Sequence, residues 1–364
     1  MGNKVLVVDD SALMRKVLRQ VLTEAGFEVE SARSGREGVE LALAFEPDVV
    51  TLDINMPEMD GLTALSLLMA ARPTPVIMVS SLTTASALPT LEALALGAVD
   101  YVAKPGGTIS LNMDVVATDL VRKVRAASKA QVRSQRSRPV RSAPRPTPRT
   151  RQVTAATVPA VAPPPVAPAP GRPEGLVMIG VSTGGPRTLE DILPQLPADF
   201  PWPVLVCQHM PAQFTTAFAE RMNQLCALQV QECDGPTPLR AGQVVIAHGG
   251  YDMVVTERLG RLIAQPVPEA AAEPWHPCVD VLVDSAMRLM PPQRLVGVLL
   301  TGMGFDGAAS MARLRGQGGR TIAESAETAV VFGMPQELIK REGADCVLPS
   351  PRIGEQLRHW VFPH

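Results

Sequence analysis

A proline-rich, basic stretch near the middle of the chain most constrains how the chain can fold. Residues 131–173 contain the run Pro163-Pro164-Pro165, many further prolines and no acidic residue. Because proline removes a backbone hydrogen-bond donor and favours extended conformations, this stretch cannot build a packed core. We expect a disordered linker over residues 130–173, joining one domain at 1–129 to a second at 174–364.

Composition is compatible with two soluble domains. The chain has 364 residues, of which 46% are hydrophobic and only 4% aromatic, so aliphatic side chains must do most of the packing, as in layered α/β folds. The amino-terminal apolar run is too short for a signal peptide, and no apolar stretch approaches the length of a membrane span. We therefore expect a cytoplasmic protein with no membrane insertion. The five cysteines form no C-x-x-C pair, so we expect reduced thiols.

The charge distribution bears on the partners. The linker carries eight arginines, and since the formal net charge of the chain is −2, the remainder is acidic. A basic segment can bind nucleic acid, but this one lacks interleaved aromatic residues. We expect no nucleic-acid partner, and we expect a monomer.

Short apolar runs alternate with helical patterns in the first domain. This alternation predicts βα units around a five-stranded, flavodoxin-like parallel sheet. Ser11 and Ser34 are placed to cap the first two helices. We expect strands at residues 4–8, 28–31, 48–52, 75–79 and 98–102.

Polar residues collect where these strands end. They are Asp9 and Asp10, Asp53, Ser80 and Lys104, and the carboxyl ends of parallel strands form the ligand site of such sheets. Three converging carboxylates repel one another unless a hard cation or a lysine compensates them. Mg²⁺ suits such a site, and a carboxylate that faces Mg²⁺ and a lysine can accept a phosphoryl group.

Three segments carry a specific resemblance over the whole first domain: Val7-Val8-Asp9-Asp10-Ser11, Leu52-Asp53-Ile54-Asn55-Met56-Pro57-Glu58-Met59-Asp60-Gly61 and Lys104-Pro105. They resemble the signature of response-regulator receiver domains. The resemblance implies that Asp53 is the phosphoacceptor. It also implies that Asp9, Asp10, Asp53 and the Asn55 carbonyl hold Mg²⁺. By the same resemblance Ser80 and Tyr101 form the switch pair, and Lys104 contacts the phosphoryl group.

The second domain opens with an apolar strand at 176–181 that runs into Gly180-Val181-Ser182-Thr183-Gly184. This fits G-x-S-x-G, in which glycines permit a sharp strand-to-helix turn that exposes a serine hydroxyl. Alone the motif is weak, because a glycine-rich turn can also bind phosphate or simply reverse the chain.

A nucleophilic serine needs a base and an orienting acid. His209, His248 and His276 are candidate bases, and position alone does not choose among them. Asp306 follows the apolar run 295–300 and is the leading acid, whereas a solvated helix face accounts for its rivals, Asp280 and Asp284. A nucleophilic Cys207 beside His209 is disfavoured because it lies within a buried strand.

Further segments resemble the chemotaxis protein-glutamate methylesterase family from residue 176 to the carboxyl terminus: Val181-Ser182-Thr183-Gly184-Gly185, Gln208-His209-Met210-Pro211, Phe218-Ala219-Glu220-Arg221, Leu300-Thr301-Gly302-Met303-Gly304, Asp306-Gly307-Ala308 and Val331-Phe332-Gly333-Met334-Pro335. The resemblance implies Ser182 as nucleophile, His209 as base and Asp306 as orienting acid. It also implies the Met303 amide as oxyanion donor, with Thr183 close by. The order Ser, His, Asp differs from the Ser, Asp, His order of α/β-hydrolases, so the fold is not that one. We expect a second doubly wound, mostly parallel α/β domain.

Two positions depart from this family's pattern. The family usually reads H-R-P-S-V-D where this chain has Trp275-His276-Pro277-Cys278-Val279-Asp280, and it usually has a histidine where this chain has Asp252. Neither departure touches the proposed triad, and both put the substrate-side contacts in doubt.

The resemblance implies a hydrolase that demethylates glutamate methyl esters on chemotaxis receptors and also deamidates receptor glutamines. A chemotaxis histidine kinase would donate the phosphoryl group, and the esterase reaction would need no cofactor. We expect the unphosphorylated receiver to cover the esterase cleft. Two rivals are a DNA-binding output domain, which would be helical and basic, and a nucleotide-dependent oxidoreductase, which would need G-x-G-x-x-G at the glycine turn.

Overall fold

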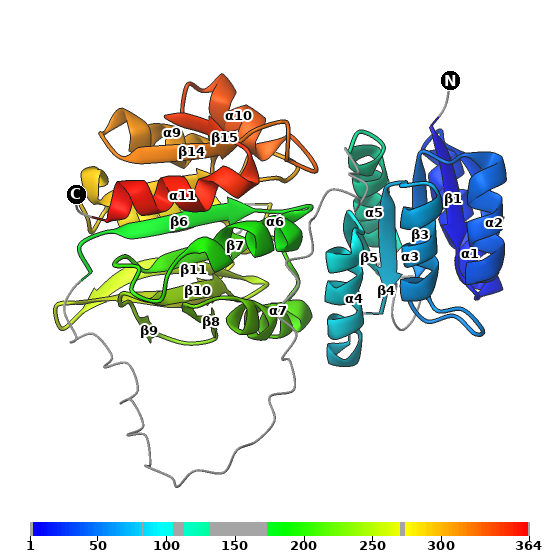
Figure 1. Cartoon of the computed structure of the whole chain (residues 1–364), viewed down its shortest axis with the longest axis horizontal. Coiled ribbons are helices and arrows are strands. Elements are labelled where there is room, and N and C mark those ends of the chain that lie inside the picture. Colours follow the sequence, from blue (N-terminus) through cyan, green and yellow to red (C-terminus); the bar gives the residue numbers. More distant parts are fainter. Residues whose placement is uncertain (1–2, 82, 105–112, 131–172, 270–273, 363–364) are drawn as a thin grey trace, which may run out of the picture.

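The computed structural model describes residues 3–81, 83–104, 113–130, 173–269 and 274–362, and these form two α/β domains (Figure 1). Nearly all of the expected linker, together with Pro105, lies outside the described residues. Within them, no helix is long and apolar enough to cross a membrane.

The first domain alternates strands and helices in regular order: β1 (Lys4–Val8), α1 (Ala12–Glu24), β2 (Glu28–Ala32), α2 (Gly35–Phe45), β3 (Val49–Asp53), α3 (Gly61–Ala71), β4 (Val76–Ser80), α4 (Thr84–Leu96), β5 (Asp100–Ala103) and α5 (Met113–Ala127). The strands are parallel in the order β2-β1-β3-β4-β5, which confirms the flavodoxin-like prediction. The last three strands begin one or two residues later than predicted. Ser11 and Ser34 cap α1 and α2 as expected, accepting from the backbone nitrogens of Met14 and Glu37.

The second domain is larger: β6 (Leu176–Val181), α6 (Gly185–Ile192), β7 (Val204–Gln208), α7 (Ala212–Leu225), β8 (Gln229–Cys233), β9 (Thr237–Pro238), β10 (Gln243–Ala247), β11 (Tyr251–Arg258), β12 (Arg261–Pro268), α8 (Val279–Met287), β13 (Leu295–Leu299), α9 (Ala308–Gly316), β14 (Arg320–Glu324), α10 (Met334–Lys340), β15 (Cys346–Leu348) and α11 (Ser350–Val361). Short 3₁₀ turns at Leu193–Gln195 and Pro292–Arg294 follow α6 and precede β13. Seven strands form a parallel sheet in the order β15-β14-β13-β6-β7-β10-β8.

Alternate residues of β6 serve opposite faces of this sheet. Val177 and Ile179 join the core that contains side chains of α6, α7 and α11, whereas Leu176 and Met178 join the core that contains side chains of α8, α9 and α10. Helices thus cover both faces, as the doubly wound prediction requires. A separate antiparallel sheet, β11-β12-β9, completes the domain and was not predicted.

The strand order of the large sheet changes direction at β6. The chain adds β7 on one side of β6 and later places β13 on the other. Ligand sites of open α/β sheets lie outside the carboxyl ends of the strands at such a switch point. The fold therefore marks the carboxyl ends of β13, β6 and β7 as the place to look for chemistry.

The two domains contact one another through α4 of the first domain and α6 and α7 of the second (Figure 1). The ring of Tyr101 in β5 lies 4.7 Å from that of Phe214 in α7, measured between centroids. One cluster of buried apolar side chains includes members from both domains.

Candidate functional sites

The polar site of the first domain centres on Asp53, the last residue of β3. Asp53 and Asp9 are 1% and 0% exposed. The Lys104 ammonium lies 2.7 Å from Asp53 Oδ2 and 3.1 Å from Asp9 Oδ2, so a single cation is shared by two buried carboxylates. The sequence prediction that these residues meet is confirmed.

The electrostatics of this site favour a further cation. Burial raises the pKa of Asp53, and the nearby charge of Asp9 adds to that effect, while Lys104 opposes it. Oxygens of Asp9, Asp10 and Asp53 lie within 4.8 Å of one another, which fits the carboxylate set that Mg²⁺ prefers. Asn55 is exposed beside them and donates its backbone N–H to Asp53 Oδ1 over 3.3 Å.

The two residues expected to form the switch pair lie in different surroundings. Ser80, at the end of β4, is 1% exposed, and its hydroxyl accepts a hydrogen bond from Thr90 Oγ1 over 3.0 Å. Tyr101 is 5% exposed because its ring is packed against Phe214 of the second domain. The sequence did not reveal that Tyr101 takes part in the interdomain contact.

Ser182 lies in the tight turn that joins β6 to α6. Its N–H donates to the Thr301 carbonyl over 2.9 Å, and its own carbonyl accepts from Gly185 N over 2.8 Å and from Gln208 Nε2 over 3.0 Å. Gly302 packs directly against it, since a Cβ on Gly302 would lie 2.7 Å from Ser182 Cβ. The predicted strand-to-helix turn is confirmed, and backbone contacts fix it on both sides.

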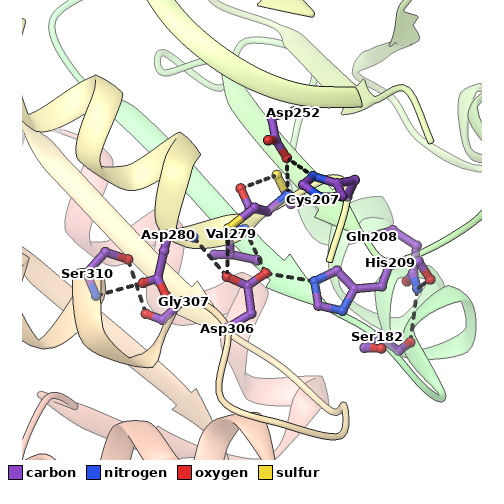
Figure 2. A network of polar contacts seen from close by, with 12 residues as sticks. Ser182, Cys207, Gln208, His209, Asp252, Val279, Asp280, Asp306, Gly307 and Ser310 are labelled. Atoms are coloured by element: carbon purple, nitrogen blue, oxygen red, sulfur yellow. Dashed lines mark hydrogen bonds and ion pairs between the residues drawn. The ribbon is translucent and has the colours of Figure 1, made fainter. Parts of the chain in front are cut away.

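His209 and Asp306 form a close pair beside this turn (Figure 2). His209 Nε2 lies 2.8 Å from Asp306 Oδ2, and the backbone N–H of His209 donates to the carbonyl oxygen of Val181 in β6 over 3.0 Å. Figure 2 shows the imidazole between the Asp306 carboxylate and Ser182. The three residues thus follow β6, β7 and β13, the three neighbouring strands at the switch point.

Asp306 is held by the start of α8. It is 1% exposed and accepts from the backbone nitrogens of Val279 and Asp280 over 2.8 and 3.0 Å, while Cys278 Sγ lies 3.2 Å away. Burial alone would raise its pKa, but the hydrogen bond and charge of His209 and the two amides outweigh burial and lower the pKa. The carboxylate is therefore ionised and rigidly placed at neutral pH.

Each of the three candidate histidines has a carboxylate partner. His209 pairs with Asp306, His248 Nδ1 lies 2.6 Å from a Glu232 oxygen, and His276 Nδ1 lies 3.0 Å from Asp252. A histidine–carboxylate pair therefore does not identify the base here. The position of His209 on the strand next to Ser182 distinguishes it from the other two.

The rival residues have other roles. The Asp280 carboxylate accepts the Ser310 N–H at the start of α9, so the expectation of a merely solvated helix face is wrong for it. Asp284 does lie at the surface, paired with Arg313. Cys207 is fully buried, and burial raises the pKa of its thiol well above the usual range, which leaves it unreactive. All five cysteines are free thiols, as expected.

Met303 and Thr183 flank the turn that carries Ser182. In the described part of the chain, no acceptor faces the Met303 backbone N–H, whereas the neighbouring Gly302 N–H donates to Val331. Thr183 is 6% exposed, and its hydroxyl donates to Asp100 Oδ2 of the first domain over 2.6 Å. Asp100 lies within β5, and nothing in its sequence context marked it as a contact to the second domain.

A receiver-like site on one domain and a Ser-His-Asp arrangement on the other define a class, the response regulators with an enzymatic output. Residues 177–357 match the CheB methylesterase family and residues 5–115 match the response regulator receiver domain. The chain therefore belongs to the CheB methylesterase family. Both rivals, a DNA-binding output and a nucleotide-dependent oxidoreductase, are thereby wrong.

Individual relatives agree over nearly the full length. The chain is 53% identical to "Protein-glutamate methylesterase/protein-glutamine glutaminase 3" of Rhodospirillum rubrum, with 98% of this chain and 96% of the relative covered. It is 48% identical to "Protein-glutamate methylesterase/protein-glutamine glutaminase 2" of Rhodopseudomonas palustris, with 98% of each covered. The crystal structure of the Thermotoga maritima CheB methylesterase catalytic domain is 38% identical at a TM-score of 0.50, covering 51% of this chain and 98% of that one.

Proposed function

We propose that this chain hydrolyses glutamate methyl esters on chemotaxis receptors and deamidates receptor glutamines, with Ser182, His209 and Asp306 as its catalytic residues. The printed names of the relatives give both activities. The observation that carries the residue assignment is the 2.8 Å His209–Asp306 pair, which lies beside Ser182 at the switch point of the sheet.

The geometry supports an acyl transfer in two stages. Because Nε2 of His209 bonds to Asp306, its buried Nδ1, which has no partner among the described residues, takes the proton of the Ser182 hydroxyl. The hydroxyl oxygen attacks the ester carbonyl, and the Met303 amide accommodates the oxyanion. His209 then protonates the departing methoxide, and methanol leaves. Water, activated by His209, cleaves the acyl-enzyme to glutamate; with glutamine the leaving group is ammonia.

The first domain supplies the control input. Asp53 is the proposed phosphoacceptor, and Asp9, Asp10 and the Asn55 carbonyl would hold Mg²⁺ beside it. Bound Mg²⁺ supplies charge neutralisation for the incoming phosphoryl group. Lys104, already 2.7 Å from Asp53, would contact the transferred group. A chemotaxis histidine kinase is the proposed donor.

The contact between the domains supports inhibition by the unphosphorylated receiver. Asp100 of β5 binds Thr183, which directly follows the proposed nucleophile, and Tyr101 lies against Phe214. A receptor segment that approaches Ser182 therefore has to compete with the receiver for this face. Phosphorylation of Asp53 would weaken the contact and expose the turn.

The catalytic assignment is tested by methanol release from methylated receptor membranes. Ser182→Ala and His209→Ala are each expected to lose several orders of magnitude in kcat, because the remaining groups cannot activate water as well. His248→Ala is the matched control, since it also removes a carboxylate-paired histidine from the same domain. If Ser182→Ala keeps a tenth of the wild-type rate, Ser182 is not the nucleophile.

The regulatory proposal is tested on one receptor preparation with three forms of the protein. These are the full chain, the full chain with a phosphoryl donor, and a fragment that starts at Glu174. Phosphorylation and truncation are both expected to raise the rate. A fragment no faster than the unphosphorylated full chain would rule out inhibition by the receiver.

A further inference from the structure

The segment 275–278 leads into α8 and is anchored by a buried carboxylate that the mechanism above does not use. Asp252 in β11 is 1% exposed. One of its oxygens, Oδ1, accepts from His276 Nδ1 over 3.0 Å and from the backbone N–H of Cys278 over 2.8 Å. The two places where the sequence departs from the family pattern, position 252 and the segment 275–278, are therefore in direct contact.

This anchor fixes the place of Trp275. The indole lies parallel to the imidazole of His209, with ring centroids 5.8 Å apart and an angle of 2° between the planes. Phe305 meets the indole edge to face, with centroids 5.0 Å apart and an angle of 84°. Gly304 leaves room for it, since a Cβ there would lie 2.7 Å from the indole, and its φ of +96° also favours glycine.

The imidazole is thus restrained in two directions. Asp306 holds its edge through Nε2, and the indole of Trp275 lies parallel to its plane on one side. A parallel aromatic neighbour limits tilting of the ring, and an indole face also stabilises the positive charge that His209 acquires when it takes a proton.

We propose that Trp275 is a positioning residue for His209, and that Asp252, through His276 and the Cys278 backbone, holds Trp275 in place. The proposal rests on the proposed role of His209 as base. It assigns the two departures from the family pattern to one structural unit. This unit acts on the rate of the chemical step and not on receptor affinity.

The test measures kcat and KM for methanol release by full-length Trp275→Ala and Trp275→Phe, with melting temperature as the check on folding. For Trp275→Ala we expect kcat to fall about 10- to 100-fold at nearly unchanged KM, because small misplacement of a catalytic group is costly. Trp275→Phe retains a ring over His209 and should stay within about threefold of wild type. Trp360→Ala, a half-buried tryptophan on α11, is the matched control and should change kcat little. A Trp275→Ala enzyme with wild-type kcat, or with only KM altered, overturns the proposal.

A double-mutant cycle separates this proposal from the assignment of the base. In a His209→Gln background, Trp275→Ala should cause no further loss of the residual rate, since it acts through His209. A multiplicative further loss would show an independent role and refute the proposal. A His209→Gln enzyme with the wild-type rate would instead refute the triad itself. The anchor is tested likewise: Asp252→Ala should lower kcat about tenfold but add nothing to Trp275→Ala.

A fluorescence measurement covers the case in which Trp275→Ala fails to fold. The chain has three tryptophans, so Trp202→Phe combined with Trp360→Phe leaves Trp275 as the sole indole. Stacking on an imidazole alters indole emission, so His209→Gln in that background should change the emission intensity. Unchanged emission would show that the two rings do not stack in solution and would overturn the proposal.

Discussion

A buried glutamate beside the nucleophile turn has a measurable effect on stability. Glu324 ends β14, is 0% exposed, and accepts the Thr301 N–H through Oε2 over 2.8 Å. Burial raises its pKa from 4.5 to about 7, and the Thr301 amide only partly opposes this effect. Thr301 in turn donates its hydroxyl to the Thr183 carbonyl over 2.8 Å, so Glu324 supports the loop next to Ser182.

The magnitude follows from the shift in pKa. One pKa unit corresponds to about 1.4 kcal/mol, so the shift from 4.5 to about 7 costs the folded state about 3 kcal/mol once the carboxyl is ionised. Because the pKa of Glu324 is higher in the folded state, the contribution of the neutral carboxyl to stability is fully present below pH 4.5. This contribution is lost as the pH rises through 7. Glu324→Gln keeps an acceptor for the Thr301 N–H and cannot ionise. We expect the variant to be about 2 to 3 kcal/mol more stable than wild type at pH 8 and equal to it at pH 4.5.

Urea unfolding followed by tryptophan fluorescence measures this difference. The three tryptophans, Trp202, Trp275 and Trp360, all lie in the second domain, so their emission reports that domain alone. The difference in unfolding free energy between variant and wild type is the quantity to plot against pH, since the contributions of the other titrating groups then cancel. Glu355→Gln, which replaces an exposed glutamate on α11, is the control and should give a flat line near zero. A flat line for Glu324→Gln as well would show that Glu324 does not titrate near neutrality.

Three further outcomes are expected from the same structure. Asp306→Asn should lower kcat by about four orders of magnitude with little change in KM, because the imidazole loses its tautomer partner; a near-normal rate would move the acid elsewhere. Asp100→Ala should raise methanol release without a phosphoryl donor by up to about tenfold, as a charge-assisted contact to Thr183 is lost, and an unchanged basal rate would contradict that. Lys104→Met should leave the basal rate intact but abolish the increase on adding acetyl phosphate; retained activation would exclude Lys104 from the switch.

Much of the fold was predictable because local pattern and tertiary fold agree. Buried parallel strands produce short continuous apolar runs, so the receiver strands were located to within one or two residues. The β11–β12 hairpin was missed for physical reasons. Its second strand carries Pro266 and Pro268, which argue against a strand, and its turn places Leu259 at a φ of 51°, where glycine or asparagine would be the usual signal.

The candidate site was also predictable only in part. Residues that follow neighbouring parallel strands lie at one edge of the sheet, so the strand pattern placed Ser182 there, with His209 among three candidate bases. Only the family resemblance selected His209 as the base, and it carried Asp306 over as the acid. The residues alone could not identify the base, since three histidine–carboxylate pairs exist and each joins residues from different parts of the sequence. The contact of Asp252 with the segment 275–278 likewise joins residues with no periodic relation.

Strand β5 connects the two proposed sites. Its first residue, Asp100, binds Thr183 beside the nucleophile; its second, Tyr101, packs on Phe214; and Lys104, just beyond its end, binds Asp53. A strand advances about 3.3 Å per residue, so these contacts lie only about 13 Å apart along one rigid element. Lys123 on α5 steadies the near end, donating to the Tyr101 carbonyl over 2.6 Å. A phosphoryl group on Asp53 would compete for Lys104 at one end of the strand. The contact between Asp100 and Thr183 at the other end would then weaken. This arrangement requires no long-range pathway, because the proposed phosphoacceptor and the proposed nucleophile are separated by one strand and its two terminal contacts.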